Sequence, residues 1–533
     1  MATMQPDDAG AIAVRPRGGS GGELQRWPAI ARLFRLHPRG AVLDGTLAAV
    51  GMLLAGWLRW SGLGRLTLWV DEMSSFGMAN TGLRQVIPTI LAFDAHPPLY
   101  ILVVHFAHRL FKLGTVDSIR VPSVVAAILT VGIVYGLARL LVGRFAAVLA
   151  TAIVTLSPLL VWYSREGRMY ALTWLFVMLS YLALVLAARS ERRIWLVTYG
   201  LAVALALYSD ISAVMALVPQ AAVVGYFCLR DRAGRSRWLG IAAAYVAGWV
   251  LFLPWLAVLP RQLPLVHGVY PGYEPSLATA WHLLEDMTGL SAGYAAVGAL
   301  VLPALLAVLV LVTFLAALMG AVWLGRSSPL YAAVTLSLTL GPAVMCVILL
   351  LAGSPGVLLP RVMSITPFGL ALAVAGTAEL AWRAWRPRRL ASAAIGAAAL
   401  VILTGTALSL VNVEAGGTKG PDWRVVAAQI SRRAQPGDAL IYYPYGLKIM
   451  VDAYLPGDSH WIKDGVGLWY SSDAVVETNF ARWAEGAPHV WLVYYAATGI
   501  DVPRHDAWLR AHGYQRIDGD VAAGAGLLEY IPD

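Results

Sequence analysis

The most regular feature of the chain is a series of long apolar segments separated by short polar turns. Helical segments of about 20 apolar residues match the thickness of a bilayer's hydrocarbon core. The pattern predicts eleven spans, at 41–58, 119–142, 145–163, 169–188, 194–209, 211–229, 237–258, 293–323, 329–352, 362–382 and 390–411. We therefore expect an all-α polytopic membrane domain over residues 41–411, preceded by a basic tail at residues 1–40.

One more apolar segment, residues 97–112, is short for a span and contains His105, His108 and Arg109. If it crossed the membrane, the later basic turns would lie outside, although Lys and Arg favour the cytoplasmic side. These turns are Arg189–Arg193, Arg230–Arg237 and Arg383–Arg389. We therefore expect an amphipathic helix on the outer surface of a bacterial cytoplasmic (inner) membrane, with the N-terminus in the cytoplasm and the C-terminus outside.

The pattern changes after the last span. Apolar runs become shorter, and Asp438–Tyr443 and His489–Tyr495 have the length and composition of buried strands. Helices are expected at Trp423–Arg433 and His505–His512. Residues 412–533 are therefore predicted to form a soluble α/β domain on the periplasmic or extracellular side.

Composition supports a membrane protein. Of the 533 residues, 59% are hydrophobic and only 13% are charged, about half the charged share of a soluble globular domain. The two cysteines, Cys228 and Cys346, both lie in apolar runs, which excludes a disulfide framework and a cysteine metal site. The net charge of +9 comes from arginines clustered at the turns, so the bilayer, and no nucleic acid, is the expected partner.

Two polar islands, Trp69–Glu72 and Phe93–Tyr100, follow the first span and are the candidate active site. Acidic residues beside a bilayer are costly unless they face water, a partner or a substrate. Together with Arg120 and the segment Ser164–Leu172, the order of these motifs resembles the GT-C glycosyltransferases. The resemblance is to the protein O-mannosyltransferase and lipid A aminoarabinose transferase type, family 39, and covers residues 41 to about 385.

The resemblance implies an enzyme that transfers a sugar from a polyprenyl-phosphate donor to an acceptor on the external face. Such a reaction needs a base for the acceptor hydroxyl and cationic groups for the departing phosphate. The resemblance assigns the base to Asp71, and Glu72 would orient the acceptor or help bind a divalent ion. An alternative is that both carboxylates only favour the positive end of a helix. A single external base implies inversion at the anomeric carbon.

A second group of residues is expected to bind the donor phosphate or sugar. Guanidinium groups suit phosphate because they bind it bidentately and stay charged near lipid. The expected donor-binding residues are His96, Arg120, Arg165, Arg168, Tyr170 and Arg361. As alternatives, His96 begins a surface helix, each arginine extends to lipid headgroups, and Glu166 is an ion-pair partner within its turn.

Candidate acceptor-binding residues lie in the external turn 208–210 and in the external loop 259–292. They are Asp210, His267, Tyr273 and Glu274, although Asp210 also suits a helix cap. Dependence on Mg²⁺ or Mn²⁺ stays open, with Asp71, Glu72 and His96 as the ligands if a metal binds. The sugar and the acceptor, whether lipid, glycan or protein, also stay open.

A transporter or flippase of lipid-linked sugars is the alternative function. Such a protein needs polar or broken helices near the bilayer midplane and often has two related halves. The sequence has neither feature. Its unexplained charges gather on the external side, and its two halves do not match.

Overall fold

The computed structural model describes most of the chain after residue 37. The described residues are 38–64, 67–262, 275–288, 322, 328–385, 403–408, 410–411, 421–443, 447–455, 462–465, 482, 484, 486–495, 502–522 and 525–533. Almost all of the predicted span 293–323, most of the span 390–411 and most of the tail 1–40 lie outside these residues.

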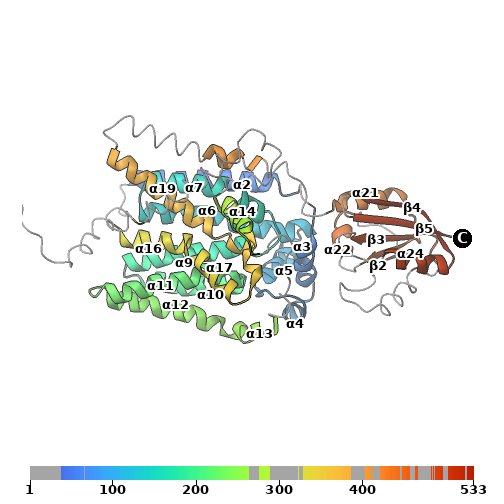
Figure 1. Cartoon of the computed structure of the whole chain (residues 1–533), viewed down its shortest axis with the longest axis horizontal. Helices are drawn as coiled ribbons and strands as arrows, with labels where there is room; N and C mark the ends of the chain where they lie inside the picture. The colour runs from blue at the N-terminus through green and yellow to red at the C-terminus, as the bar shows by residue number, and fades with distance from the viewer. Residues whose placement is uncertain are drawn as a thin grey trace, which may run out of the picture.

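Long helices lie side by side and form a bundle (Figure 1). In the described part of the chain, five helices are long and apolar enough to cross a membrane, and two bent helix pairs raise the number to seven. The five are α2 (Pro38–Ser61), α6 (Thr115–Leu141), α9 (Tyr170–Arg189), α11 (Val214–Arg230), preceded by η2 (Ile211–Ala213), and α12 (Arg235–Leu256). The bent pairs are α7 (Arg144–Leu156) with α8 (Pro158–Ser164), at 59°, and α16 (Pro329–Thr339) with α17 (Gly341–Leu351), at 40°.

Two further helices, α10 (Arg193–Ser209) and α19 (Thr366–Trp385), pack in the same bundle. Each predicted span within the described residues therefore corresponds to one helix or one bent pair. The membrane domain is confirmed as helical and apolar, whereas the total of eleven spans stays a prediction.

The basic turns between the spans gather at one end of the bundle. Arg189, the last residue of α9, donates a hydrogen bond to the carbonyl of Leu140 near the end of α6, at 2.6 Å. Arg383 of α19 donates to the carbonyl of Val142 at 2.9 Å, just beyond the same helix end. Arg237 of α12 donates to the carbonyl of the residue before Arg189, at 3.0 Å. The three turns on which the sidedness prediction rests therefore lie together.

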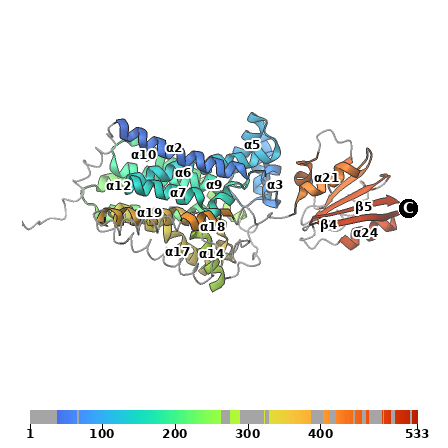
Figure 2. The ribbon, with the colours of Figure 1, turned by 90° about the horizontal axis from the view of Figure 1, so that it is seen from above.

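The polar islands lie at the opposite end of the bundle (Figures 1 and 2). The short elements there are α3 (Val70–Ala79), α4 (Leu83–Phe93), α5 (Leu99–Phe111), α13 (Leu259–Gln262), α14 (Leu277–Thr288), η4 (Pro355–Leu358) and α18 (Pro360–Met363). The helix predicted at 97–112 is present as α5, which has 13 residues and is shorter than a span. One face of α5 is buried on the bundle, and Phe106, Leu110 and Phe111 of the other face are exposed.

The last part of the chain forms a five-stranded sheet in the order β2-β1-β3-β5-β4. Its elements are α21 (Trp423–Arg433), β1 (Ala439–Tyr443), α22 (Leu447–Asp452), β2 (Ile462–Gly465), β3 (Val490–Tyr495), α24 (Val502–Ala511), β4 (Tyr514–Ala522) and β5 (Ala525–Pro532). β1 is parallel to β2 and β3, whereas β5 is antiparallel to β3 and β4. The elements predicted at Trp423–Arg433, 438–443 and 489–495 are thus present within one residue of their expected bounds.

The sheet segment (residues 421–533) lies beyond the end of the bundle that carries α3 (Figures 1 and 2). Helix α22 contacts α3, and a Cβ added to Gly77 of α3 would lie 3.2 Å from Ile449 Cδ1 of α22. Met450 and Val451 of α22 belong to the same hydrophobic core as Phe76 of α3. The sheet segment is therefore packed directly on the helix that carries the acidic pair.

Candidate active site

Asp71 and Glu72 lie in the first turn of α3, where negative charge favours the helix dipole. Adjacent residues of a helix point about 100° apart, so the two carboxylates enter different surroundings. The Asp71 side chain is 31% exposed, whereas the Glu72 side chain is 1% exposed. Only Asp71 is therefore open to a substrate, which the sequence alone does not reveal.

Glu72 is held by Arg120 of α6 in a buried, bidentate ion pair. Arg120 Nε and Nη2 donate to the two Glu72 carboxylate oxygens at 2.8 and 2.7 Å. The Gly167 amide donates to Glu72 Oε1 at 2.6 Å, and a Cβ at Gly167 would lie 2.8 Å from Ile119. Since both side chains are enclosed and satisfied, the arrangement gives Glu72 no access to an acceptor and Arg120 none to a phosphate. We reassign both residues to holding the site together.

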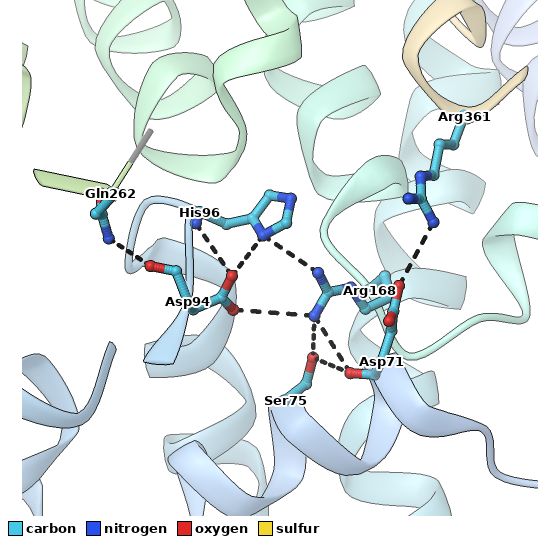
Figure 3. Close-up of polar contacts among 7 residues, drawn as sticks. All are labelled: Asp71, Ser75, Asp94, His96, Arg168, Gln262 and Arg361. Carbon is cyan, nitrogen blue, oxygen red and sulfur yellow. Dashed lines mark hydrogen bonds and ion pairs between the residues drawn. The ribbon is translucent and has the colours of Figure 1, made fainter. Parts of the chain in front are cut away.

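Arg168 is the centre of the site (Figure 3). It lies between α8 and α9, and Nη1 donates to Ser75 Oγ at 2.8 Å and to the Asp71 carbonyl at 3.2 Å. Its Nη1 also lies 4.0 Å from Asp94 Oδ2. Burial would lower the pKa of Arg168, but the carboxylates of Asp71 and Asp94 hold that pKa above its ordinary value. Arg168 therefore stays charged and joins the two polar islands.

His96 and Asp94 form the second part of the cluster. His96 Nδ1 lies 2.6 Å from Asp94 Oδ1 and 3.3 Å from Arg168 Nη2, and the His96 amide also donates to Asp94 Oδ1 (Figure 3). Burial would raise the pKa of Asp94, but His96 and Arg168 hold it well below its usual range. A charged Asp94 accepting from Nδ1 leaves Nε2 of the half-exposed His96 as the nitrogen directed away from this carboxylate.

Arg361 of α18 approaches Asp71 from the other side of the site (Figure 3). Its Nη1 lies 3.5 Å from Asp71 Oδ2, and its side chain is 19% exposed. Tyr170, the first residue of α9, is buried nearby with its ring edge against Tyr163. The partly exposed Asp71 carboxylate thus faces Arg361, while Arg168 holds the Asp71 carbonyl and interacts with the carboxylate through its charge.

Two other expected site residues have structural surroundings. Arg165 donates to the carbonyls of Leu58 and Arg59 at the end of α2, which fixes the turn after α8. Asp210 lies between α10 and η2 and accepts from Ser212 Oγ, but its side chain forms no cap hydrogen bond to the η2 backbone. These contacts assign Arg165 to the junction of α2 with the turn after α8, and Asp210 to the turn after α10.

Among the described residues, no group of three or more His, Cys, Asp or Glu side chains could hold a metal ion. Asp71, Glu72 and His96 do not converge, because Arg120 encloses Glu72. The expected acceptor-binding residues His267, Tyr273 and Glu274 lie outside the described residues.

The chain resembles known proteins in both sequence and fold. A family model for dolichyl-phosphate-mannose-protein mannosyltransferase matches residues 95–259. ArnT from Cupriavidus metallidurans in the apo state has a similar structure, with a TM-score of 0.54 and 14% identity over 92% of this chain and 97% of ArnT. The archaeal oligosaccharyltransferase AglB from Archaeoglobus fulgidus, in complex with an inhibitory peptide and a dolichol-phosphate, gives a TM-score of 0.52 and 12% identity over 92% of this chain and 74% of AglB. No curated protein matches the sequence.

This chain has the GT-C glycosyltransferase fold. The similarity inferred from the sequence motifs is thereby confirmed. A second ArnT structure from the same organism, bound to undecaprenyl phosphate, has a TM-score of 0.53 and 13% identity over 92% of this chain and 98% of that chain. The family match includes His96, Arg120 and Arg168, so the cluster around Arg168 belongs in part to the region shared with the mannosyltransferase family.

Sequence reasoning did not select three residues that this GT-C site contains. They are Asp94, Ser75 and Gln262, whose amide donates to the Asp94 carbonyl at 2.8 Å (Figure 3). Asp94 had a signal, because it stands two residues before His96 within the second polar island. Ser75 lies one helical turn after Asp71 and shares its face, whereas no local pattern distinguishes Gln262.

Proposed function

We propose that the chain transfers a sugar from a polyprenyl-phosphate-linked donor to an acceptor on the external face of the bacterial cytoplasmic membrane. The observation that carries the proposal is the partly exposed Asp71 carboxylate, which lies 3.5 Å from Arg361, on a residue whose main-chain carbonyl accepts from Arg168. The shared fold with an ArnT bound to undecaprenyl phosphate and an AglB in complex with a dolichol-phosphate supports a lipid-phosphate donor.

In this reaction the Asp71 carboxylate accepts the proton of the acceptor hydroxyl. The hydroxyl oxygen attacks the anomeric carbon, and the bond from that carbon to the phosphate oxygen breaks with inversion. The negative charge moves to the departing lipid phosphate, where a guanidinium group stabilises it. Each part is provided by a side chain of the described site.

Arg361 has two roles in the proposed cycle. Its Nη1 lies 3.5 Å from Asp71 Oδ2 and forms a long ion pair with that carboxylate before substrate binds. A bound donor phosphate offers Arg361 a bidentate partner whose negative charge grows as the bond to the sugar breaks, and this draws the guanidinium from Asp71 to the phosphate. The Asp71 carboxylate then loses this ion pair and faces the proton of the acceptor hydroxyl. His96, with its Nε2, and Tyr170 complete the donor site.

The arrangement of charges supports the proposed sidedness. The basic turns lie at one end of the bundle and the Asp71 site lies at the other. Since Lys and Arg favour the cytoplasmic side, the site and the sheet segment face the periplasm or the exterior. The sugar-binding and acceptor-binding roles of Asp210, His267, Tyr273 and Glu274 stay predictions, and we derive no step through a divalent cation.

Asp71→Asn tests the proposal in purified protein reconstituted in lipid. A panel of polyprenyl-phosphate sugars is offered with a membrane extract as the acceptor source. Loss of a general base lowers turnover by about 10²- to 10⁴-fold, and we expect this of Asp71→Asn. Asp117→Asn is the matched control, because Asp117 is an exposed first-turn aspartate of α6.

Two results would contradict the proposal. One is equal loss in both variants, which would indicate a general effect of removing charge at this end. The other is a wild-type protein that consumes no donor but moves labelled lipid between leaflets, which would make the chain a flippase.

A further inference from the structure

The sheet segment contacts the backbone that leads into α3. Tyr454, just after α22, accepts a hydrogen bond at its hydroxyl oxygen from the buried Leu68 amide, at 3.1 Å. Thr67 Oγ1 donates to the carbonyl of Pro421 at 2.9 Å. Arg424 Nη1 donates to the carbonyl of Gly64 at 3.3 Å. Three hydrogen bonds that involve side chains thus join the short connector between α2 and α3 to the sheet segment.

The same connector provides two carbonyl oxygens that accept hydrogen bonds from Arg120. Arg120 Nη1 donates to the carbonyl of Leu63 at 2.7 Å, and Nη2 donates to the carbonyl of Thr67 at 3.1 Å. With its remaining donors Arg120 holds Glu72, and Glu72 accepts from the Gly167 amide. The sheet segment is therefore connected, contact by contact, to the turn that carries Arg168 and to the helix that carries Asp71.

The links on the bundle side of this series are buried, whereas Tyr454 and Arg424 on the sheet segment are partly exposed. Thr67, Leu68, Glu72 and Arg120 are all less than 5% exposed. Buried hydrogen bonds and charges have no water to replace a lost partner, so a displaced connector changes the whole series. If only a flexible linker joined the sheet segment to the bundle, a change in the sheet segment would not displace this connector.

We propose that Tyr454 is a positioning residue of the Asp71 site. By holding the Leu68 amide, it fixes the carbonyls that orient Arg120, and through Glu72 it sets the places of Asp71 and Arg168. This inference rests on the proposed function for its kinetic readout. It gives the sheet segment a part in turnover that is separate from any recognition of an acceptor.

Tyr454→Phe is the direct test, in full-length protein reconstituted in lipid. It leaves the Leu68 amide buried without an acceptor, a loss worth roughly 1–3 kcal/mol, or about five- to 150-fold. We expect kcat to fall at least fivefold while the donor KM stays within about twofold, because Arg361 on α18 is outside the series. Tyr442→Phe is the matched control, since the buried Tyr442 hydroxyl donates to Asp452 within the sheet segment.

Hydrogen exchange supplies a readout that does not depend on activity. The Gly167 amide lies at the far end of the series, and we expect it to exchange faster in Tyr454→Phe and unchanged in Tyr442→Phe. Thr67→Val perturbs the same connector from the bundle side, because it removes the hydrogen bond from Thr67 to the Pro421 carbonyl. For Thr67→Val we also expect a lower kcat with a nearly unchanged donor KM. If Tyr454→Phe does not fold, Thr67→Val is the variant that tests the positioning role.

The outcomes separate the two proposals. If Tyr454→Phe and Thr67→Val keep wild-type kcat and wild-type exchange at Gly167, the positioning role is wrong. If the wild-type protein transfers no sugar, the proposed function fails, and the exchange of Gly167 alone then decides the positioning role. Faster exchange at Gly167 in both variants would support it, and unchanged exchange would overturn it.

Discussion

Replacement of Arg168 by lysine tests whether the fork of the guanidinium, in addition to its charge, organises the site. Arg168 Nη1 contacts Ser75 and the Asp71 carbonyl, and Nη2 contacts His96. A lysine keeps the positive charge near Asp94 but lacks the guanidinium fork, so it loses the two Nη1 hydrogen bonds to Ser75 and the Asp71 carbonyl. The approach of Nη2 to His96 Nδ1 adds no hydrogen bond, because that nitrogen donates to Asp94. At about 0.5–1.5 kcal/mol for each hydrogen bond, the loss is roughly 1–3 kcal/mol.

If these contacts place Asp71 for proton transfer, the loss appears in turnover. We expect kcat of Arg168→Lys to fall about five- to 150-fold, measured as donor-dependent sugar transfer in reconstituted protein. Arg165→Lys is the matched control, because Arg165 lies three residues away in the same turn and donates to the carbonyls of Leu58 and Arg59. It is expected to lower thermal stability and to leave turnover of the folded protein near wild type.

Two results would refute this reasoning about Arg168. A folded Arg168→Lys protein with kcat within twofold of wild type would show that charge alone suffices. An equal loss in Arg165→Lys would show that the turn as a whole, and not the contacts of Arg168, determines turnover.

Two further predictions concern stability. Glu72→Gln leaves the buried Arg120 without its ionic partner, so we expect the free energy of unfolding to fall by about 3–5 kcal/mol, with much of it regained when both residues are replaced by leucine. Thermal unfolding in detergent measures this, and an unchanged midpoint in the single variant would disprove the structural role. For Asp94, the pKa lies below its ordinary value because His96 and Arg168 outweigh the effect of burial. Its stabilising contribution is therefore present above about pH 4 and is lost as the pH falls further, so Asp94→Asn is expected to flatten the decline in stability below about pH 4. A decline as steep as that of the wild type would contradict this.

Several features of this protein follow from local sequence patterns. The apolar runs predict the helices of the bundle because a span must satisfy its backbone hydrogen bonds internally. Helix α21 has the bounds predicted from Pro421–Asp422 and the following periodicity, since Asp422 accepts from the Arg424 amide as a cap. The polar islands were recognisable because charge beside a bilayer is costly and therefore informative.

Local patterns do not tell which of two adjacent carboxylates faces the substrate. Asp71 and Glu72 are neighbours in a first helical turn, and only the packing of α6 against α3 encloses one of them. The same holds for the arginines, because residue type and sidedness are alike for Arg120, Arg165, Arg168 and Arg361. Their partners come from other elements of the fold. Arg120 pairs with the buried Glu72, and Arg361 pairs with the partly exposed Asp71. Arg165 donates to two carbonyls of α2, and Arg168 joins the cluster around Ser75.

By itself, the sequence determined that this protein is a helical membrane protein with its chemistry at one end, because hydrophobic burial and the cost of charge act on every short segment. Only the tertiary structure decided which polar groups meet. It joined Asp71 with Arg361 across 290 positions of the chain and Leu68 with Tyr454 across 386. Such pairings depend on how rigid helices pack, and the local sequence around either residue does not reveal its distant partner.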